Sequence, residues 1–387
     1  MRILIATNAL TGHFRPLLPF ADACRRAGHE LLVVAPESFA PAVADAGLPH
    51  HPCADVSAEA RAAAMATLSG LPPDQAATRL GVEIFSRLGP RAALPCMTDA
   101  IRTWRPHVIL RETAELASLL AAEREGLPHV TVRIELAAVI DQGTRQHAAP
   151  VAQMRAEAGL PPAYEGQWLR RGPYFTLVPA SLEDPTIPGS ANTLRFRAPR
   201  EHRRTKPPWL PPGDDPLIYL SFGTVAGMAP PYSHLYPAAI NALAALPIRV
   251  VVGLGDTGDP ATLGPLPPHV RVERWLPQDQ AMPHAAAMVC HGGAGSVITG
   301  LAAGVPMALL PLFGDQPDNA RRVAALGAGI ALDGPAAIGQ LPQAVRTLLH
   351  DSSYRQAAQR LAAEIDHLPP VDQAVITLET IARNVLR

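Results

Sequence analysis

The sequence lacks several features that would narrow its functional class. No stretch reaches the roughly 18 consecutive apolar residues of a membrane span, so we expect no stable membrane insertion. Lysine occurs once, at Lys206, the net charge is −1 and no long basic run is present, so nucleic acid is not an expected partner. The chain opens directly on a strand-like run without the pattern of a signal peptide, and we therefore expect a cytoplasmic protein.

Cysteine is also scarce and unpaired in the sequence. The four cysteines are Cys24, Cys53, Cys96 and Cys290, and none lies at the paired spacing of a metal site. In a reducing compartment such scattered cysteines are typically free thiols. We therefore expect four free thiols and no metal.

What the chain does contain is an alternation of apolar strands and amphipathic helices. Its 387 residues favour two domains over one. A strand over 2–6, a helix over 16–27 and a strand over 30–35 form a βαβ unit, which predicts a parallel sheet. Ligands of such sheets bind beyond the carboxyl ends of the strands. The polar loop 7–14, which contains His13, is therefore at a functional edge.

The most informative stretch is a glycine-rich turn in the second half. A buried strand over 286–290 leads into His291-Gly-Gly-Ala-Gly-Ser296, and helical spacing follows to Ala303. Glycines let the backbone turn tightly and approach a ligand. The free N–H groups and positive dipole end of the new helix then favour an anion, most naturally a diphosphate.

Other segments suggest where the domains begin and end. Residues 55–104 predict helices with apolar faces able to line a hydrophobic pocket, whereas residues 133–170 carry little regular signal and are expected to be loops. Proline and arginine are dense between 198 and 216, which is typical of an exposed linker. We therefore predict a domain over 1–200, a linker over 201–216, a second domain over 217–370 and a terminal helix over 371–387.

Four motifs in the second half follow strand ends and so point to one site. They are Ser221-Phe-Gly-Thr224, Arg274-Trp-Leu-Pro-Gln278, His291 to Ser296, and Leu312-Phe-Gly-Asp-Gln-Pro-Asp-Asn319. With the Gly12-His13 loop, they closely resemble the family 1 glycosyltransferases of the GT-B fold, and more narrowly the bacterial enzymes that glycosylate antibiotic aglycones. The resemblance covers almost the whole chain. It implies an α/β architecture of two Rossmann-like parallel-sheet domains that face a central cleft, with the terminal helix packing back on the first domain.

The resemblance also assigns roles to individual residues. His13 matches the catalytic base, and Glu112 stands where the family usually has an aspartate that holds the base, with Glu115 as an alternative. Donor-binding positions are Ser221, Gly223, Thr224, Trp275, Leu276, Gln278, His291, Gly293, Ala294, Gly295, Ser296, Asp315 and Gln316. Apolar acceptor-binding positions are Phe14, Met65, Ile84, Phe85 and Leu88.

The implied reaction is transfer of a sugar, a deoxysugar by resemblance, from a dTDP- or UDP-sugar to a hydrophobic natural-product aglycone. The sequence has no Asp-X-Asp motif, so a metal-independent, inverting displacement is expected. No cofactor is implied, because the nucleotide sugar is a co-substrate, and a homodimer is compatible with the sequence.

Three alternatives remain open. A nucleotide-sugar epimerase of the same architecture would share the donor residues, and a catalytically silent helper subunit would share the fold. The pair of His13 and a carboxylate at Glu112 argues against the silent subunit. A nicotinamide dehydrogenase is disfavoured because the first loop lacks the G-x-G-x-x-G spacing of a dinucleotide site.

Overall fold

The computed structural model describes residues 1–161, 163, 172–187, 189–200, 207, 209–226, 232, 234–255 and 258–385. The chain divides into two units, the first comprising Met1–Val178, Pro185–Pro199 and Pro369–Arg387, and the second Pro179–Asp184 and Arg200–Leu368. Part of the expected linker, 201–206 and 208, lies outside the described residues.

The first unit is built on a parallel sheet. Its described strands run in the order β3-β2-β1-β4-β5-β6-β7. Strands β2 and β3 are added on one side of β1, and the strands from β4 onwards are added on its other side. The carboxyl ends of β1 and β4 therefore form a topological switch point, where ligands of such sheets bind. The strands are β1 Arg2–Ala6, β2 Glu30–Pro36, β3 His50–Cys53, β4 Val108–Glu112, β5 His129–Arg133, β6 Tyr174–Thr176 and β7 Thr193–Arg195.

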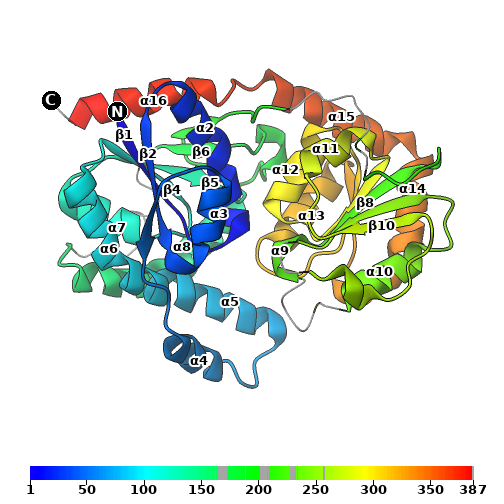
Figure 1. The fold of residues 1–387 in the computed structure, drawn as a ribbon, viewed down its shortest axis with the longest axis horizontal. Helices are drawn as coiled ribbons and strands as arrows, with labels where there is room; N and C mark the ends of the chain where they lie inside the picture. The colour runs from blue at the N-terminus through cyan, green and yellow to red at the C-terminus, as the bar shows by residue number, and fades with distance from the viewer. Residues whose placement is uncertain are drawn as a thin grey trace. The chain divides into compact units, whose positions relative to one another are not determined.

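Helices cover this sheet, and the last helix of the chain is one of them. Helix α16 places Ala374, Val375 and Leu378 in the same hydrophobic core as Phe20 of α2, and the two helices lie side by side in Figure 1 (red and blue). The helices of this unit are α1 Thr11–Phe14, α2 Leu18–Arg26, α3 Ala40–Asp45, α4 Ala58–Ala66, α5 Pro73–Glu83, α6 Gly89–Trp104, α7 Ala117–Glu125, α8 Ala137–Glu157 and α16 Asp372–Val385.

The second unit repeats the pattern. Its described strands are parallel in the order β10-β9-β8-β11-β12-β13, which is the strand order of a dinucleotide-binding Rossmann sheet, with the switch point between β8 and β11. The strands are β8 Leu217–Ser221, β9 Arg249–Gly253, β10 Val270–Glu273, β11 Ala287–Cys290, β12 Met307–Leu309 and β13 Gly329–Ala331. The helices are α9 Gly223–Ala226, α10 Leu235–Leu243, α11 Gln278–Ala281, α12 Ala294–Ala302, α13 Gln316–Ala325, α14 Leu341–His350 and α15 Ser352–His367.

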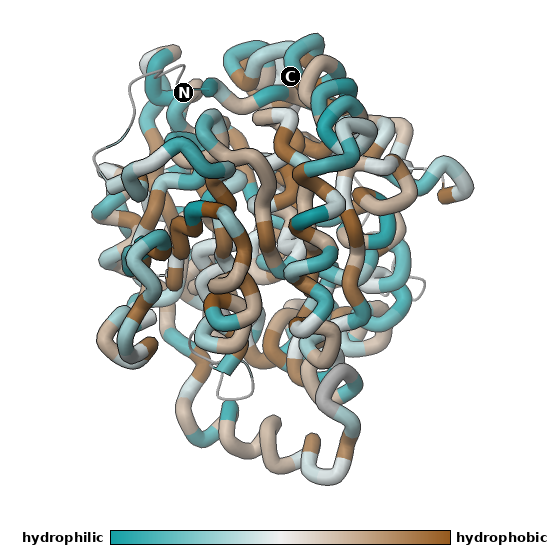
Figure 2. Tube along the Cα trace, turned by 90° about the vertical axis from the view of Figure 1, so that its right-hand side faces the viewer, coloured by the Kyte–Doolittle hydropathy of each residue, from teal (hydrophilic) through white to brown (hydrophobic). Residues whose placement is uncertain are grey.

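Burial of the middle strands explains their apolar sequences. Every residue of β4, β8 and β11 is buried, as expected for parallel strands covered by helices on both faces. Figure 2 shows brown hydrophobic stretches alternating with teal hydrophilic ones along the trace. In the described part of the chain, no helix combines the length and apolar character needed to cross a membrane.

Two expectations about local structure are wrong. Residues 137–157, expected as loop, form the long helix α8, whose periodicity is obscured by Gly143 and Pro150. The loop 7–14 contains one helical turn, α1, which carries His13. The short strands β3, β6, β7 and β13 carry too few residues to show a periodic pattern.

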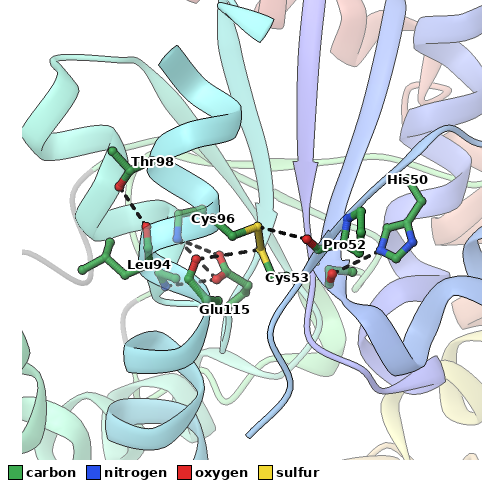
Figure 3. The surroundings of a disulfide bond; sticks show 11 residues. His50, Pro52, Cys53, Leu94, Cys96, Thr98 and Glu115 are labelled. Atoms are coloured by element: carbon green, nitrogen blue, oxygen red, sulfur yellow. Dashed lines mark hydrogen bonds between the residues drawn. A yellow bond between two sulfur atoms is a disulfide. The ribbon is translucent and has the colours of Figure 1, made fainter. Parts of the chain in front are cut away.

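The expectation of four free thiols is also wrong. Cys53, at the end of β3, and Cys96, in α6, form a disulfide bond (Figure 3), whereas Cys24 and Cys290 are free and buried. The two bonded cysteines are 43 residues apart in the sequence, so only the packing of α6 beside β3 brings them together.

Candidate active site

The first unit has a candidate site at the switch point of its sheet. Strands β1 and β4 pair in parallel with Ala6 opposite Arg111, so Glu112 ends its strand at the edge where the chain leaves β1. The α1 turn that follows brings His13 to the same edge. The Nδ1 atom of His13 lies 3.2 Å from Oε2 of Glu112.

Glu112 is buried but fully supplied with donors. Its Oε1 accepts a hydrogen bond from Asn8 Nδ2 (2.7 Å) and its Oε2 accepts one from the backbone N–H of Ala114 (2.6 Å). Burial would raise the pKa of this carboxyl, but the charge and hydrogen bond of His13, the Ala114 N–H and the charge of Arg111 outweigh it and lower the pKa. Glu112 is therefore an ionised carboxylate facing His13.

The alternative partner, Glu115, is used elsewhere. Its carboxylate accepts hydrogen bonds from the backbone N–H groups of Ala117 and Ser118, both at 3.0 Å, at the start of α7. Burial raises the pKa of Glu115, although Arg111 and Ser118 act in the opposite direction. Among the two carboxylates, Glu112 is the one that contacts His13.

The contact with Glu112 defines what His13 can do. A carboxylate accepts hydrogen bonds only, so it favours the tautomer with the proton on Nδ1 and leaves the lone pair on Nε2. A ring held in this way can accept a proton from a substrate hydroxyl. The ring of Phe85 stacks on the imidazole, with centroids 5.5 Å apart and planes inclined by 22°.

The expected acceptor residues do not all lie with His13. Ile84, Phe85 and Leu88 share one half-buried π-helical turn, Ile84–Leu88, between α5 and α6. Phe14 is only 2% exposed and packs in the core against Phe39, so little of its side chain is accessible and its assignment to the acceptor site stays a prediction. Met65 lies on α4 and is 56% exposed.

The second unit has a candidate site of its own, at the switch point of its sheet. Ser221 at the end of β8 pairs with Cys290 at the end of β11, so the two following turns are neighbours. The imidazole of His291 fills the space between them: a Cβ added at Gly223 or Gly293 would lie 2.6 or 2.5 Å from His291 Nε2. Only glycine fits at these two positions.

This enclosure sets the charge of His291. Burial lowers the pKa of the imidazole to about 4, against a smaller opposing effect of a backbone hydrogen bond with Ser221. His291 is therefore neutral near pH 7. It can donate one hydrogen bond to a ligand, as the sequence predicts, but it carries no positive charge at this pH.

The anion-binding geometry comes from the backbone of α12. Gly293 is the N-cap and supplies no side chain, so the N–H groups of the first turn, at Ala294, Gly295 and Ser296, have no acceptor within the helix. These donors and the helix dipole favour a negatively charged group. Gln278 Nε2 donates to Ser296 Oγ at 3.2 Å, which links α11 to the same turn.

Not every expected donor residue is equally available. Trp275 is 42% exposed, whereas Leu276 is 4% exposed and serves as packing. Gln316 Oε1 accepts from the backbone N–H groups of Leu312 (2.8 Å) and Phe313 (3.1 Å), so this oxygen braces the loop and only the amide nitrogen remains for a ligand. Asp315 is the N-cap residue of α13, and Thr224 lies in α9.

Three residues that support the site were not singled out from the sequence. Asn8 holds Glu112, and Asn319 donates to the carbonyl oxygen of Gly292 (2.9 Å) and to Asp315 Oδ2 (2.7 Å). Tyr236 Oη accepts from Phe222 N–H (3.0 Å) and donates to the Gly253 carbonyl (3.2 Å), tying the ends of β8 and β9 together. Asn8 lies in the loop 7–14 and Asn319 ends the motif that begins at Leu312. Their places in these two segments were the only indication in the sequence that they support the site.

Residues suited to metal binding are not clustered in the described ranges. No group of three or more histidine, cysteine, aspartate or glutamate side chains there has an arrangement that could hold a metal ion.

Two family profiles match consecutive parts of the chain. Residues 22–159 match the erythromycin biosynthesis protein CIII-like N-terminal domain, and residues 208–385 match the UDP-glucoronosyl and UDP-glucosyl transferase family. These two ranges contain Glu112 of the first unit and every expected donor residue of the second.

Relatives match over the full length. The L-demethylnoviosyl transferase of Streptomyces niveus is 29% identical over 384 residues, which is 94% of either chain. The thymidine diphosphate complex of SsfS6 from Streptomyces sp. SF2575 is 28% identical with a TM-score of 0.76, covering 98% of this chain and 99% of SsfS6. The glycosyltransferase VinC, in complex with dTDP, has a TM-score of 0.78 at 23% identity and covers 99% and 100% of the two chains. The chain is therefore a family 1 glycosyltransferase of the GT-B fold, of the type found in bacterial natural-product biosynthesis.

Proposed function

We propose that this glycosyltransferase moves a sugar from a dTDP-sugar to a hydroxyl group of a hydrophobic aglycone, in one inverting step that requires no metal ion. The observation that carries the proposal is the contact of His13 Nδ1 with the buried, ionised carboxylate of Glu112. A neutral hydroxyl is a weak nucleophile, and an imidazole oriented by a carboxylate can accept its proton as it attacks.

The donor would be held by the second unit. The N–H groups at the start of α12 and the Nε2 atom of the neutral His291 are suited to the oxygens of a diphosphate, and they would stabilise the charge that develops as the nucleoside diphosphate leaves. The exposed ring of Trp275 offers a face for the nucleobase. Asp315 and the Gln316 amide nitrogen would bind sugar hydroxyls. Thymidine diphosphate is favoured because SsfS6 and VinC were solved with it.

The acceptor would be a hydrophobic natural product, as the relatives suggest. Phe85, in the Ile84–Leu88 turn, stacks on the His13 ring, and Ile84 and Leu88 belong to the same turn. Direct attack of the acceptor oxygen on the anomeric carbon, opposite to the leaving diphosphate, inverts its configuration and needs no protein nucleophile. Metal independence is inferred from the lack of an Asp-X-Asp motif and is tested by turnover in excess chelator.

Donor binding is tested by calorimetry with dTDP, UDP, GDP and NAD. We expect dTDP to bind, and we expect His291→Ala to weaken its binding while the fold is retained. Equal affinity of mutant and parent for dTDP would contradict the assignment of His291. Binding of NAD alone would instead support a dehydrogenase.

Acceptor placement is tested by a photoreactive aglycone analogue. We expect labelling of the segment from α4 to α6 and of α8, in the first unit. Labelling confined to the second unit would contradict it. Product analysis with and without an aglycone separates transfer from epimerisation, because an epimerase alters the nucleotide sugar without any acceptor.

A further inference from the structure

The π-helical turn that carries Phe85 is joined to α8 by a pair of polar side chains, of which Ser86 is buried and His147 half-buried. Ser86 Oγ and His147 Nδ1 form a short hydrogen bond, and Ser86 is fully buried. His147 comes from the helix over 137–157 that the sequence did not predict. Burial lowers the pKa of His147, so its imidazole is neutral near pH 7 and can accept or donate in this bond. The reaction described above uses neither residue.

The turn itself is held in an uncommon backbone form. The N–H of Gly89 donates to the carbonyl oxygen of Ile84, five residues earlier, which widens the helix locally. Such π turns interrupt the regular stacking of an α-helix and occur frequently at functional sites. Because the regular α-helical hydrogen bonds are interrupted in a widened turn, they restrain its orientation less. Side-chain contacts therefore contribute more to the directions in which its residues point.

Two neighbouring residues of this turn make different kinds of contact, one through ring stacking and the other through a hydrogen bond. Phe85 stacks on the imidazole of His13, and Ser86 bonds to His147. Phe85 and Ser86 are consecutive residues of one hydrogen-bonded turn, so holding the backbone at Ser86 also holds it at Phe85. A buried polar bond is directional, whereas an apolar contact at the same place would tolerate rotation.

The stacking contact completes the orientation of the base. The contact with Glu112 fixes the Nδ1 end of the His13 ring but allows the ring plane to turn about the direction of that bond. Contact with the flat face of Phe85 restricts this remaining rotation. Together the two contacts determine where the lone pair on Nε2 points, which is the property a general base needs.

We propose that Ser86 and His147 are positioning residues for the base: their bond holds the π turn so that Phe85 fixes the ring plane of His13. This inference rests on the proposed function, because it assigns the pair a role in proton transfer from the acceptor.

Three variants and one control test it. Ser86→Ala and His147→Leu remove the bond, whereas His147→Asn keeps an amide near the position of Nδ1 and should restore it. Thr144→Ala is the matched control, because Thr144 is a buried hydroxyl on the same helix that bonds only within α8, to the carbonyl of Ile140. Thermal unfolding of each variant establishes that it is folded.

Turnover is measured on two acceptors, an aliphatic alcohol and an acidic nitrophenol. Transfer to the alcohol depends on the base, because general base catalysis raises the rate of such reactions by roughly 10²–10⁴-fold. We expect Ser86→Ala and His147→Leu to lower kcat on the alcohol about tenfold or more and on the nitrophenol far less, with unchanged dTDP affinity. His147→Asn and Thr144→Ala should behave as the parent does. An equal loss on both acceptors would show that the pair only supports packing.

A second readout needs no substrate. The ring current of Phe85 shifts the carbon-bound imidazole protons of His13 upfield, and these signals are assigned by their loss in His13→Ala. In Ser86→Ala they should move towards the values of a free histidine, and unchanged shifts would overturn the inference. If the shifts move but the parent transfers no sugar to either acceptor, the contact stands and the proposed function is what fails.

Discussion

A single methyl group added at Gly293 tests how closely the His291 imidazole is enclosed. The added Cβ would lie 2.5 Å from His291 Nε2 and 3.0 Å from Cε1, well inside van der Waals contact. The backbone of Gly293 has φ −61° and ψ 142°, which any residue adopts, so the effect of Gly293→Ala comes from the clash and not from backbone strain. Overpacking of this kind costs about 1–3 kcal/mol. For a unit of this size that corresponds to a decrease in Tm of about 2–12 °C.

The same helix supplies the matched control. Gly295 lies two residues further along α12, is exposed, and would place a Cβ with nothing within 4 Å. We expect Gly295→Ala to be neutral or to stabilise the helix by up to about 1 kcal/mol. In a His291→Ala background the ring is gone, so the cost of Gly293→Ala should largely disappear, and the difference measures the coupling between the two positions.

The assay is scanning calorimetry of the parent, the three single variants and the double variant, followed at the transition that unfolds the second unit. Titration with dTDP then reports whether the displaced ring disturbs the start of α12. The account is refuted if Gly293→Ala and Gly295→Ala shift Tm equally, or if Gly293→Ala costs as much without His291 as with it.

Three further predictions concern charge and covalent links. Glu112→Gln should lower kcat on an alcohol acceptor by less than loss of the base does, because the amide still accepts a hydrogen bond but carries no charge; an unchanged kcat would contradict this. The pKa of His291 is about 4 in the folded state and near 6.5 in the unfolded state, so the unfolded state binds more protons between these two pH values. The free energy of unfolding should therefore fall by about 3 kcal/mol as the pH decreases from above 6.5 to 4. In denaturant titrations, His291→Asn should remove this part of the acid dependence. Reduction of the Cys53–Cys96 disulfide, which spans 43 residues, should destabilise the first unit by up to about 4 kcal/mol, whereas a double serine variant should not respond to reductant.

The sequence allowed the two parallel sheets and both switch points to be predicted, because buried parallel strands are short apolar runs and the turns after them carry the polar residues. The glycine turn at 291–296 and the position of His13 after a strand were found in this way, whereas the pairing of His13 with Glu112 came from the resemblance to family 1 glycosyltransferases. The partner of His13 could not be chosen, because Glu112 and Glu115 are close in sequence and only the start of α7 shows that Glu115 caps that helix.

Other features depend on tertiary contacts that no local pattern reveals. Phe14 follows His13 directly, but the helical turn α1 directs it into the core. Helix α8 was missed because Gly143 and Pro150 interrupt its pattern, and with it the bond of His147 to Ser86. The neutral state of His291 follows from its burial between two glycines, which composition and spacing do not indicate.

The most direct measurement of the account is the turnover of His13→Ala on a weakly acidic alcohol acceptor with a saturating dTDP-sugar. The Nδ1 atom of His13 lies 3.2 Å from the ionised carboxylate of Glu112, a contact that favours the tautomer with its lone pair on Nε2. If it is the general base, kcat should fall by roughly 10²–10⁴-fold while dTDP affinity, which belongs to the second unit, stays at the parental value. Parental turnover of His13→Ala on that alcohol would contradict the account.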